Sequence, residues 1–178
     1  METPTRYHRL PKEDEIISQD LEAFDWNTAI ENFEASVAER KKYPDFVQRG
    51  VKVVGGIDTE DETRWNMLPT LVSHHAELIP VVQEMRKVIE FKHAVKDPNR
   101  VNCHMFISLV SRSQCFDWHN DYDNTYIWQI KGRTKWYTGE DDAILEPNDM
   151  IYIPHGKMHR LEIIEPRISV SFSIERKV

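Results

Sequence analysis

The chain has 178 residues, of which 40 % are hydrophobic and 30 % are charged, and its formal net charge is −7. This length suits one domain, and the abundance of Trp, Phe and Tyr argues against disorder. The negative charge disfavours a nucleic-acid partner, because such binding needs a basic surface. No apolar run approaches the ~20 residues of a membrane helix, and the first residues lack the apolar core of a signal peptide. We therefore expect a cytoplasmic protein with no membrane partner.

Helical patterns and loops fill residues 1–98. Within residues 28–41, Ile30, Phe33 and Val37 recur at spacings of three and four. This spacing places the three side chains on one face of a helix. The segment is therefore predicted to be an amphipathic helix whose apolar face packs against the rest of the domain.

A second, longer helical region is predicted over residues 68–95, where apolar residues again recur at the helical period. Pro80 lies inside this region and is expected to start a new helix or to kink a single one, because proline lacks the amide proton that a helix interior needs. His74 and His75 also fall inside it. Adjacent helix positions point about 100° apart, so these imidazoles are expected to be ordinary helix residues and not joint ligands of one metal ion.

From residue 99 onward the sequence changes to short segments rich in β-branched and aromatic residues, separated by turn signals such as Pro-Asn-Asp and Pro-His-Gly. Eight short strands with tight connections and no helices between them favour a closed or sandwich-like barrel. We therefore predict a single domain over residues 1–178, mainly β with some α. Residues 99–178 would form the barrel, and the helices of residues 1–98 would pack on one outer face. The eight predicted strands are residues 101–110, 114–119, 124–130, 134–139, 143–147, 149–154, 159–164 and 167–174.

The most informative motif pairs a histidine with an aspartate, since His119 and Asp121 lie two residues apart. In a strand, such residues point to the same side, so an imidazole and a carboxylate can act together. His159 follows 38 residues after Asp121, beyond a strand and a tight turn that can return the chain beside the first pair. An isolated His-x-Asp motif is commonly formed by two polar surface residues, but the barrel pattern around this one favours a metal site. Two His and one carboxylate on one face of an octahedral ion suit non-haem Fe(II), because the opposite positions stay open.

Beyond these three residues, a distributed set follows a known pattern. The pattern runs from His-x-Asp through a strand to Gln, then to Gly-x-[Lys/Arg]-x-Trp and to Pro-Gly-Asp-x-x-Tyr-Ile-Pro-x-x-x-x-His. The matching residues are His119, Asp121, Gln129, Gly132, Trp136, Pro147, Asn148, Asp149, Tyr152, Ile153, Pro154 and His159. Over residues 101–178 the sequence resembles the cupin-fold, Jumonji-C-like 2-oxoglutarate oxygenases, in particular their small hydroxylase branch.

The resemblance implies a double-stranded β-helix, the cupin or jelly-roll barrel, with flanking N-terminal helices. It also implies that Fe(II) binds His119, Asp121 and His159, and that 2-oxoglutarate is the co-substrate used together with molecular oxygen. The implied activity is that of a dioxygenase that hydroxylates a small molecule, an amino acid or a peptide. Related barrels often dimerise through added helices, so a homodimer through the N-terminal half is a further expectation.

One position departs from the family pattern. The residue two after Gly132 is usually basic and binds the distal carboxylate of 2-oxoglutarate, but here it is Thr134. Because a dicarboxylate buried without a cation is poorly compensated, either 2-oxoglutarate is not used or its anchor lies elsewhere. A metal cupin independent of 2-oxoglutarate, such as a lyase, an isomerase or a dioxygenase with Fe, Mn, Ni or Zn, is therefore an alternative. A non-catalytic cupin-fold binding module is another.

A replacement anchor is present on the last predicted strand. Arg167 and Ser169 follow His159 and resemble the Arg-x-Ser of another large branch of 2-oxoglutarate oxygenases, where the guanidinium and the hydroxyl bind the distal carboxylate. The two residues share one strand face, and the guanidinium matches a carboxylate bidentately. The alternative interpretation is that Arg167 is a surface residue paired with Glu162 or Glu165.

Other polar residues near the motif are secondary candidates. Asn124, Thr125 and Tyr126, which follow the His-x-Asp motif, are candidates to contact the co-substrate through amide or hydroxyl groups, as is Thr134. The alternative for the first three is packing or turn chemistry. Asp123 has the same strand parity as the ligand aspartate, so it is an alternative carboxylate ligand. His104, on the first barrel strand, is expected to be a satisfied core residue. The aromatic residues predicted to fill the barrel core are Trp118, Trp128 and Trp136.

Overall fold

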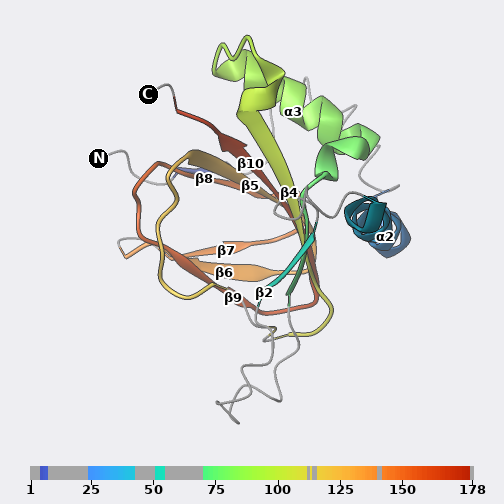
Figure 1. Cartoon of the computed structure of the whole chain (residues 1–178). Coiled ribbons are helices and arrows are strands. Elements are labelled where there is room, and N and C mark those ends of the chain that lie inside the picture. Colours follow the sequence, from blue (N-terminus) through green and yellow to red (C-terminus); the bar gives the residue numbers. More distant parts are fainter. Residues whose placement is uncertain are drawn as a thin grey trace.

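The structure of the chain is a computed structural model that describes residues 5–7, 24–42, 51–54, 70–111, 113, 116–139 and 142–176. Within these ranges the chain forms two antiparallel sheets that face each other, with two α-helices flanking the larger sheet (Figure 1). This is a jelly-roll architecture, mainly β with some α. The predicted fold class is therefore confirmed.

The larger sheet is organised around β10 (Arg167–Ile174), which pairs antiparallel with β4 (Val101–Ser108) on one side and with β5 (Asn124–Lys131) on the other. Its full order is β1 (Thr5–Tyr7), β8 (Met150–Ile153), β5, β10, β4, β3 (Thr70–Ser73) and β2 (Val51–Val54). The smaller sheet has the order β7 (Ala143–Leu145), β6 (Thr134–Tyr137) and β9 (Arg160–Ile163).

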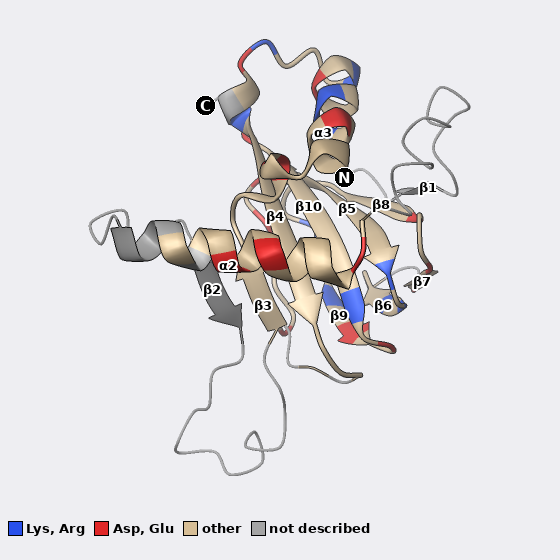
Figure 2. Cartoon of the chain, turned by 90° about the vertical axis from the view of Figure 1, so that its right-hand side faces the viewer, with Lys and Arg blue, Asp and Glu red and all other residues tan. Residues whose placement is uncertain are grey.

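Both helices lie outside the larger sheet, as the sequence predicted (Figure 2). Helix α2 (Trp26–Lys42) begins after Asp25, whose carboxylate accepts the N–H of Thr28 at 2.9 Å and so caps the first turn. Helix α3 (Pro80–Lys92) starts with proline in its first turn, where the missing amide proton leaves no bond unmade. Neither described helix combines the length and the apolar character that crossing a membrane requires.

Side chains alternate between the two faces of the central strands, and these faces differ in chemistry. On the face toward the helices, apolar residues of β4, β5 and β10 pack with α2 and α3 into the larger core. On the face toward the smaller sheet, a second apolar cluster is present, formed by Ile127, Trp136, Leu145, Ile151 and Ile153. Polar side chains line other parts of this interior, and the candidate site lies among them.

The prediction of one helical region over residues 68–95 is wrong in its first part. The chain there forms β3, then a 3-10 turn at Ala76–Leu78, and only then α3. β3 pairs with β2 and β4, and this long-range pairing overrides the helical periodicity of the local sequence. His74 and His75 therefore lie in the connection after β3 and not in a helix.

Two other predictions need correction. Seven of the eight predicted barrel strands form among the described residues, but 116–119 is a loop in which His119 makes only an isolated bridge. Residues 114 and 115 of that predicted strand lie outside the described residues. Trp118 is 45 % exposed, so it is not part of the barrel core. Trp136 does lie in the barrel interior, whereas Trp128 packs on the helix side of the sheet.

Gly132 explains one residue of the sequence pattern and yields a stability prediction. Its φ is +70°, and a Cβ added there would overlap the backbone carbonyl of Pro166. Gly139 has a similar φ of +84°, but a Cβ there would meet nothing within 4 Å. We expect Gly139→Ala to lose about 1 kcal/mol of unfolding free energy from backbone strain alone, and Gly132→Ala to lose more than about 3 kcal/mol because overlap is added.

Chemical denaturation of both variants measures this difference. Equal losses in the two variants would contradict the role assigned to the close approach of Pro166.

Candidate metal centre

Backbone hydrogen bonds hold the three predicted ligands together, although none of them lies inside a long strand. His119 and His159 form an antiparallel bridge in which each N–H donates to the other residue's carbonyl, at 3.0 and 2.8 Å. The carbonyl of Asp121 accepts the N–H of Gly156 at 2.9 Å. The loop before β5 and the turn before β9 are thus fixed against each other, and the predicted juxtaposition of the three side chains is present.

The side-chain geometry gives each histidine a defined tautomer. The Nδ1 of His119 lies 2.6 Å from the carbonyl of Asp117, and the Nδ1 of His159 lies 2.9 Å from the carbonyl of Lys157. A carbonyl only accepts, so Nδ1 carries a proton in both rings, and Nε2 is the nitrogen that can bind a metal ion. Carbonyl partners of this kind commonly orient metal-bound imidazoles.

The two Nε2 atoms converge on the carboxylate of Asp121. Its Oδ1 is 3.9 Å from Nε2 of His119, and its Oδ2 is 3.6 Å from Nε2 of His159. One potential ligand atom from each residue lies within 4.8 Å of the others. Two imidazole nitrogens and a carboxylate on one side of a shared space fit a divalent ion such as Fe(II).

Burial helps to keep the donor set in the form that binds metal. His159 is only 2 % exposed, and this burial is the main reason that its pKa is lowered. The imidazole of His119 lowers it further, while the Lys157 carbonyl and the Asp121 carboxylate act in the opposite direction. The net shift favours the neutral imidazole, which is the form that coordinates a metal ion.

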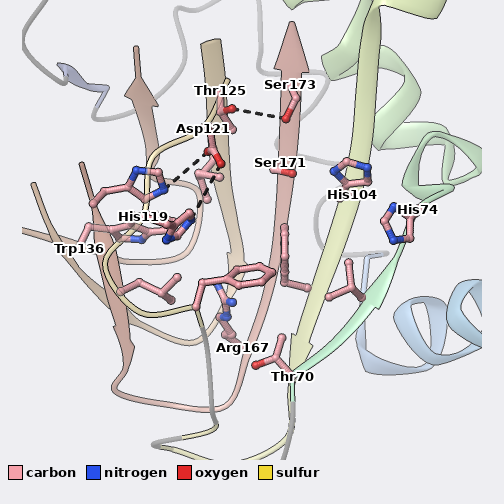
Figure 3. Close-up of a pocket in the computed structure, with 16 residues that line it drawn as sticks. Thr70, His74, His104, His119, Asp121, Thr125, Trp136, Arg167, Ser171 and Ser173 are labelled. Carbon is pink, nitrogen blue, oxygen red and sulfur yellow. Dashed lines mark hydrogen bonds and ion pairs between the residues drawn. The ribbon is translucent and has the colours of Figure 1, made fainter. Parts of the chain in front are cut away.

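The triad opens into a cavity of about 260 Å³ between the two sheets (Figure 3). Trp136 lines it beside the triad, with its ring centroid 5.9 Å from that of His159. Arg167 and Thr70 line one end, while Thr125 and Ser173 line the other. His74 and His104 line the side of the cavity across from the triad.

Arg167 belongs to this cavity and not to the protein surface. It is 2 % exposed, and its guanidinium donates to the hydroxyls of Ser108 and Ser169, both at 3.2 Å. The alternative pairing with an acidic neighbour is wrong, because Glu165 forms its ion pair with Arg133 at 2.9 Å. Similarly, the carboxylate of Glu162 accepts the Tyr137 hydroxyl at 2.8 Å.

Ser169 and Thr134 lie behind the cavity lining in a buried hydrogen-bond network. The Ser169 hydroxyl donates to Oε1 of Gln129 at 2.9 Å, and the Thr134 hydroxyl donates to the same oxygen at 3.0 Å. Thr134 in turn accepts the indole N–H of Trp136 at 3.0 Å. Gln129 therefore joins the residue that holds Arg167 to the residue that holds Trp136.

The predicted co-substrate contacts of Tyr126 and Asn124 are wrong. The Tyr126 hydroxyl lies 2.8 Å from Nε2 of His93 on the helix side of the sheet, because Tyr126 has the opposite strand parity to the cavity residues. The Asn124 side chain accepts the N–H of His155 at 2.9 Å and does not line the cavity. On β5 it is Thr125, between them, that faces the cavity.

The candidate ligand Asp123 and the expected core residue His104 also change roles. Asp123 is not part of the cluster of potential ligand atoms that the described residues form. His104 is not a satisfied core residue, since it lines the cavity together with Ser171. A sequence signal for His104 and Ser171 existed: on β4 and β10, polar residues alternate with apolar ones, and alternation assigns the polar set to one face.

Comparisons with known proteins are consistent with this architecture. No protein-family model and no curated protein sequence matches the chain. Among solved structures, the Escherichia coli ribosomal oxygenase YcfD in complex with cobalt and succinic acid superimposes with a TM-score of 0.54 and 19 % identity, over 72 % of this chain and 40 % of YcfD. A second structure of YcfD gives a TM-score of 0.51 and 18 % identity, over 63 % of this chain and 33 % of YcfD.

The chain has a jelly-roll fold that YcfD shares over the matched residues. A cupin-superfamily protein from Desulfitobacterium hafniense matches more weakly, with a TM-score of 0.41 and 14 % identity over 44 % of this chain and 70 % of that protein. The chain matches less than half of the length of YcfD. At these identities the likeness concerns the fold, so the chemistry rests on the residues of this chain.

The geometry predicts which carboxylate contributes to metal binding. Asp121→Ala should weaken the binding of Co(II) by more than roughly 100-fold, a larger loss than a residue outside the coordination sphere usually causes. Asp123→Ala removes a carboxylate two residues away that is not part of the cluster, and it should leave the affinity unchanged. Titration of the metal-free protein with Co(II), followed by visible absorption, measures both. A comparable loss of Co(II) affinity in Asp123→Ala would contradict the assignment of Asp121 as the ligand.

Proposed function

We propose that the protein is a non-haem Fe(II)- and 2-oxoglutarate-dependent oxygenase that hydroxylates a small molecule, an amino acid or a peptide. The observation that carries this proposal is that one cavity holds both the two-His, one-Asp donor set and the buried Arg167. The donor set suits Fe(II), and a guanidinium suits the distal carboxylate of a dicarboxylic acid. The complex of YcfD with cobalt and succinic acid supports it, since succinate is what remains of 2-oxoglutarate after decarboxylation.

The residues of the chain would prepare the site before any ligand arrives. His119, Asp121 and His159 would hold the ion, and their positions are set by the backbone bridge and by the two Nδ1 hydrogen bonds. When bound, Fe(II) supplies the oxygen-activating chemistry of this enzyme class. A ligand cluster held in place in this way does not have to be organised when the metal binds.

Arg167 would anchor the co-substrate at a distance from the metal. The hydroxyls of Ser108 and Ser169 orient its guanidinium, and Ser169 is itself held by Gln129. Apolar lining residues, among them Ile127 and Leu161, would exclude water around the reacting atoms. Arg167 on β10 would thus supply the positive charge that the family pattern places at position 134 on β6.

The proposal is tested by adding Fe(II) and then 2-oxoglutarate to the protein without oxygen. A visible charge-transfer band is expected, because the keto acid then chelates an iron ion in the site. Succinate should be released slowly when air is admitted. Metal binding without a band and without succinate would favour a metal cupin independent of 2-oxoglutarate. Absence of metal binding would favour a binding module.

The anchor role of Arg167 predicts a selective loss of co-substrate affinity. Arg167→Lys keeps the positive charge but loses the planar fork, and Arg167→Ala loses both. We expect the alanine variant to weaken 2-oxoglutarate binding by ~2–5 kcal/mol and the lysine variant to weaken it less. Arg133→Ala, which removes a partly exposed guanidinium paired with Glu165, is the matched control and should change nothing.

Titration of the charge-transfer band at fixed Fe(II) measures these affinities, and Co(II) binding reports whether the metal centre is intact. An unchanged 2-oxoglutarate affinity in both Arg167 variants would place the anchor elsewhere.

A further inference from the structure

His104 and Ser171 form a polar wall in the same cavity. They are direct cross-strand partners on β4 and β10, and both side chains face the cavity. The ring of His104 meets the ring of His74 edge to face, with 4.6 Å between the centroids. Figure 3 shows these imidazoles on the opposite side of the cavity from His119 and Asp121, with Ser171 on the strand between.

The polar atoms of this wall are available to a ligand. Within the part of the chain that the structure describes, neither the ring nitrogens of His104 nor the hydroxyl of Ser171 has a hydrogen-bond partner. The neighbouring hydroxyls differ, since Thr125 and Ser173 lie 3.4 Å apart and Thr70 and Ser108 lie 2.8 Å apart. Both groups face the cavity, so their hydrogen-bonding capacity is open to a molecule that enters it.

The wall carries no formal charge near neutral pH. Burial, reinforced by His74 and His75, lowers the pKa of His104 to about 4, so this imidazole is neutral. Among the described residues that line the cavity, the charged groups are Asp121 and Arg167, and the proposed function assigns both to metal and co-substrate. A charged substrate group at this wall would lack an opposite charge and would lose hydration energy.

The imidazoles of His74 and His104 also line a second cavity of about 520 Å³, which is more polar. Its charged residues include Arg86, which bonds Glu90 at 2.8 Å, and Glu175, which accepts the Asn102 amide at 3.1 Å. Neither lines the first cavity. The imidazole pair thus lies between the cavity that holds the triad and a second cavity lined by charged residues.

Size restricts what can reach the wall. The first cavity, of about 260 Å³, has to hold the metal ion, the co-substrate and the reacting part of the substrate. This is less than the ~300–1,000 Å³ of pockets that enclose drug-sized ligands. Only a small group of the substrate can therefore lie between the triad and the wall.

We propose that His104 and Ser171 form a subsite for a neutral hydrogen-bonding group of the substrate, and specifically for a carboxamide. A neutral imidazole offers one donor and one acceptor, and a hydroxyl offers both. A carboxamide has its donor and its acceptor on adjacent atoms, so it can bind both protein groups at once. The subsite is defined by the residues of the chain, and its place in catalysis rests on the proposed oxygenase function.

The test compares three probes of similar size: propionamide, propionate and propylammonium. Each probe is titrated into the chain of 178 residues, which carries 15N-labelled histidine and is supplied with Zn(II) in place of a redox-active metal. His104→Phe identifies the imidazole signal of His104. Propionamide is expected to shift that signal with millimolar affinity, while the two charged probes leave it in place.

Ser171→Ala should weaken propionamide binding about threefold to tenfold, as expected for one lost hydrogen bond. Ser173→Ala is the matched control, because its hydroxyl lies on the same strand face but beside Thr125. Its propionamide affinity should equal that of the unmodified chain. A charged probe that shifts the His104 signal at equal or lower concentration would overturn the proposal, and so would an unchanged affinity in Ser171→Ala.

This experiment needs neither oxygen nor turnover, so it separates two kinds of failure. Absence of the charge-transfer band with 2-oxoglutarate would overturn the oxygenase function while a propionamide response still supports the subsite. A band without a propionamide response at His104 would retain the oxygenase and overturn the subsite.

Discussion

Strand β10 is paired on both sides, and the alternation of its side chains divides the molecule into two environments. Ile168, Val170 and Phe172 point toward the helices and are fully buried in the larger core. Arg167, with the three serines that alternate after it, points into the space between the sheets. A shift of one residue in the pairing would exchange the two sets, which would bury the guanidinium among apolar side chains. The apolar core therefore fixes the register that brings Arg167 to the cavity.

The metal centre depends on a different kind of constraint. Its residues lie in loops, where side chains would ordinarily be free to reorient. The reciprocal backbone bonds between His119 and His159, with the bond from Gly156 to Asp121, remove this freedom. The Nδ1 bonds to backbone carbonyls then fix the imidazole tautomers. The donor set is thus assembled by main-chain groups, which are present whatever the neighbouring side chains are.

The buried polar network connects these two parts of the site. Gln129 accepts hydrogen bonds from Ser169 and Thr134, which in turn contact Arg167 and Trp136. Thr134 therefore has a structural task at the position where the resembled family carries a basic residue. Because every bond in the network is buried, the loss of one member would leave polar groups unsatisfied and shift the others. The guanidinium and the indole beside the triad are held as a unit.

The sequence by itself determined the residues of the candidate site and much of the local secondary structure. The His-x-Asp spacing and the turn before His159 predicted three residues that the structure brings together, although His119 and Asp121 lie in a loop and not in the expected strand. Arg167 was predicted from the resemblance of Arg167 and Ser169 to a known motif, and the alternation of the last strand does turn both toward the interior. Helix α2, the start of α3 at Pro80 and seven barrel strands were also predicted, because apolar periodicity and the effect of proline are local properties. Tyr126 and Asn124 were predicted as contacts only because they follow the His-x-Asp motif, and strand parity turns both away from the cavity that Thr125 faces.

Tertiary structure alone decided the rest. β3 forms because β2 and β4 pair with it, where the local sequence predicted a helix. This pairing places His74 beside His104. The unpaired state of His104 and Ser171 depends on which neighbours the fold brings to them, and their residue types carry no such information. Strand pairing and cavity shape arise from contacts distant in the chain, so they cannot be obtained from local periodicity.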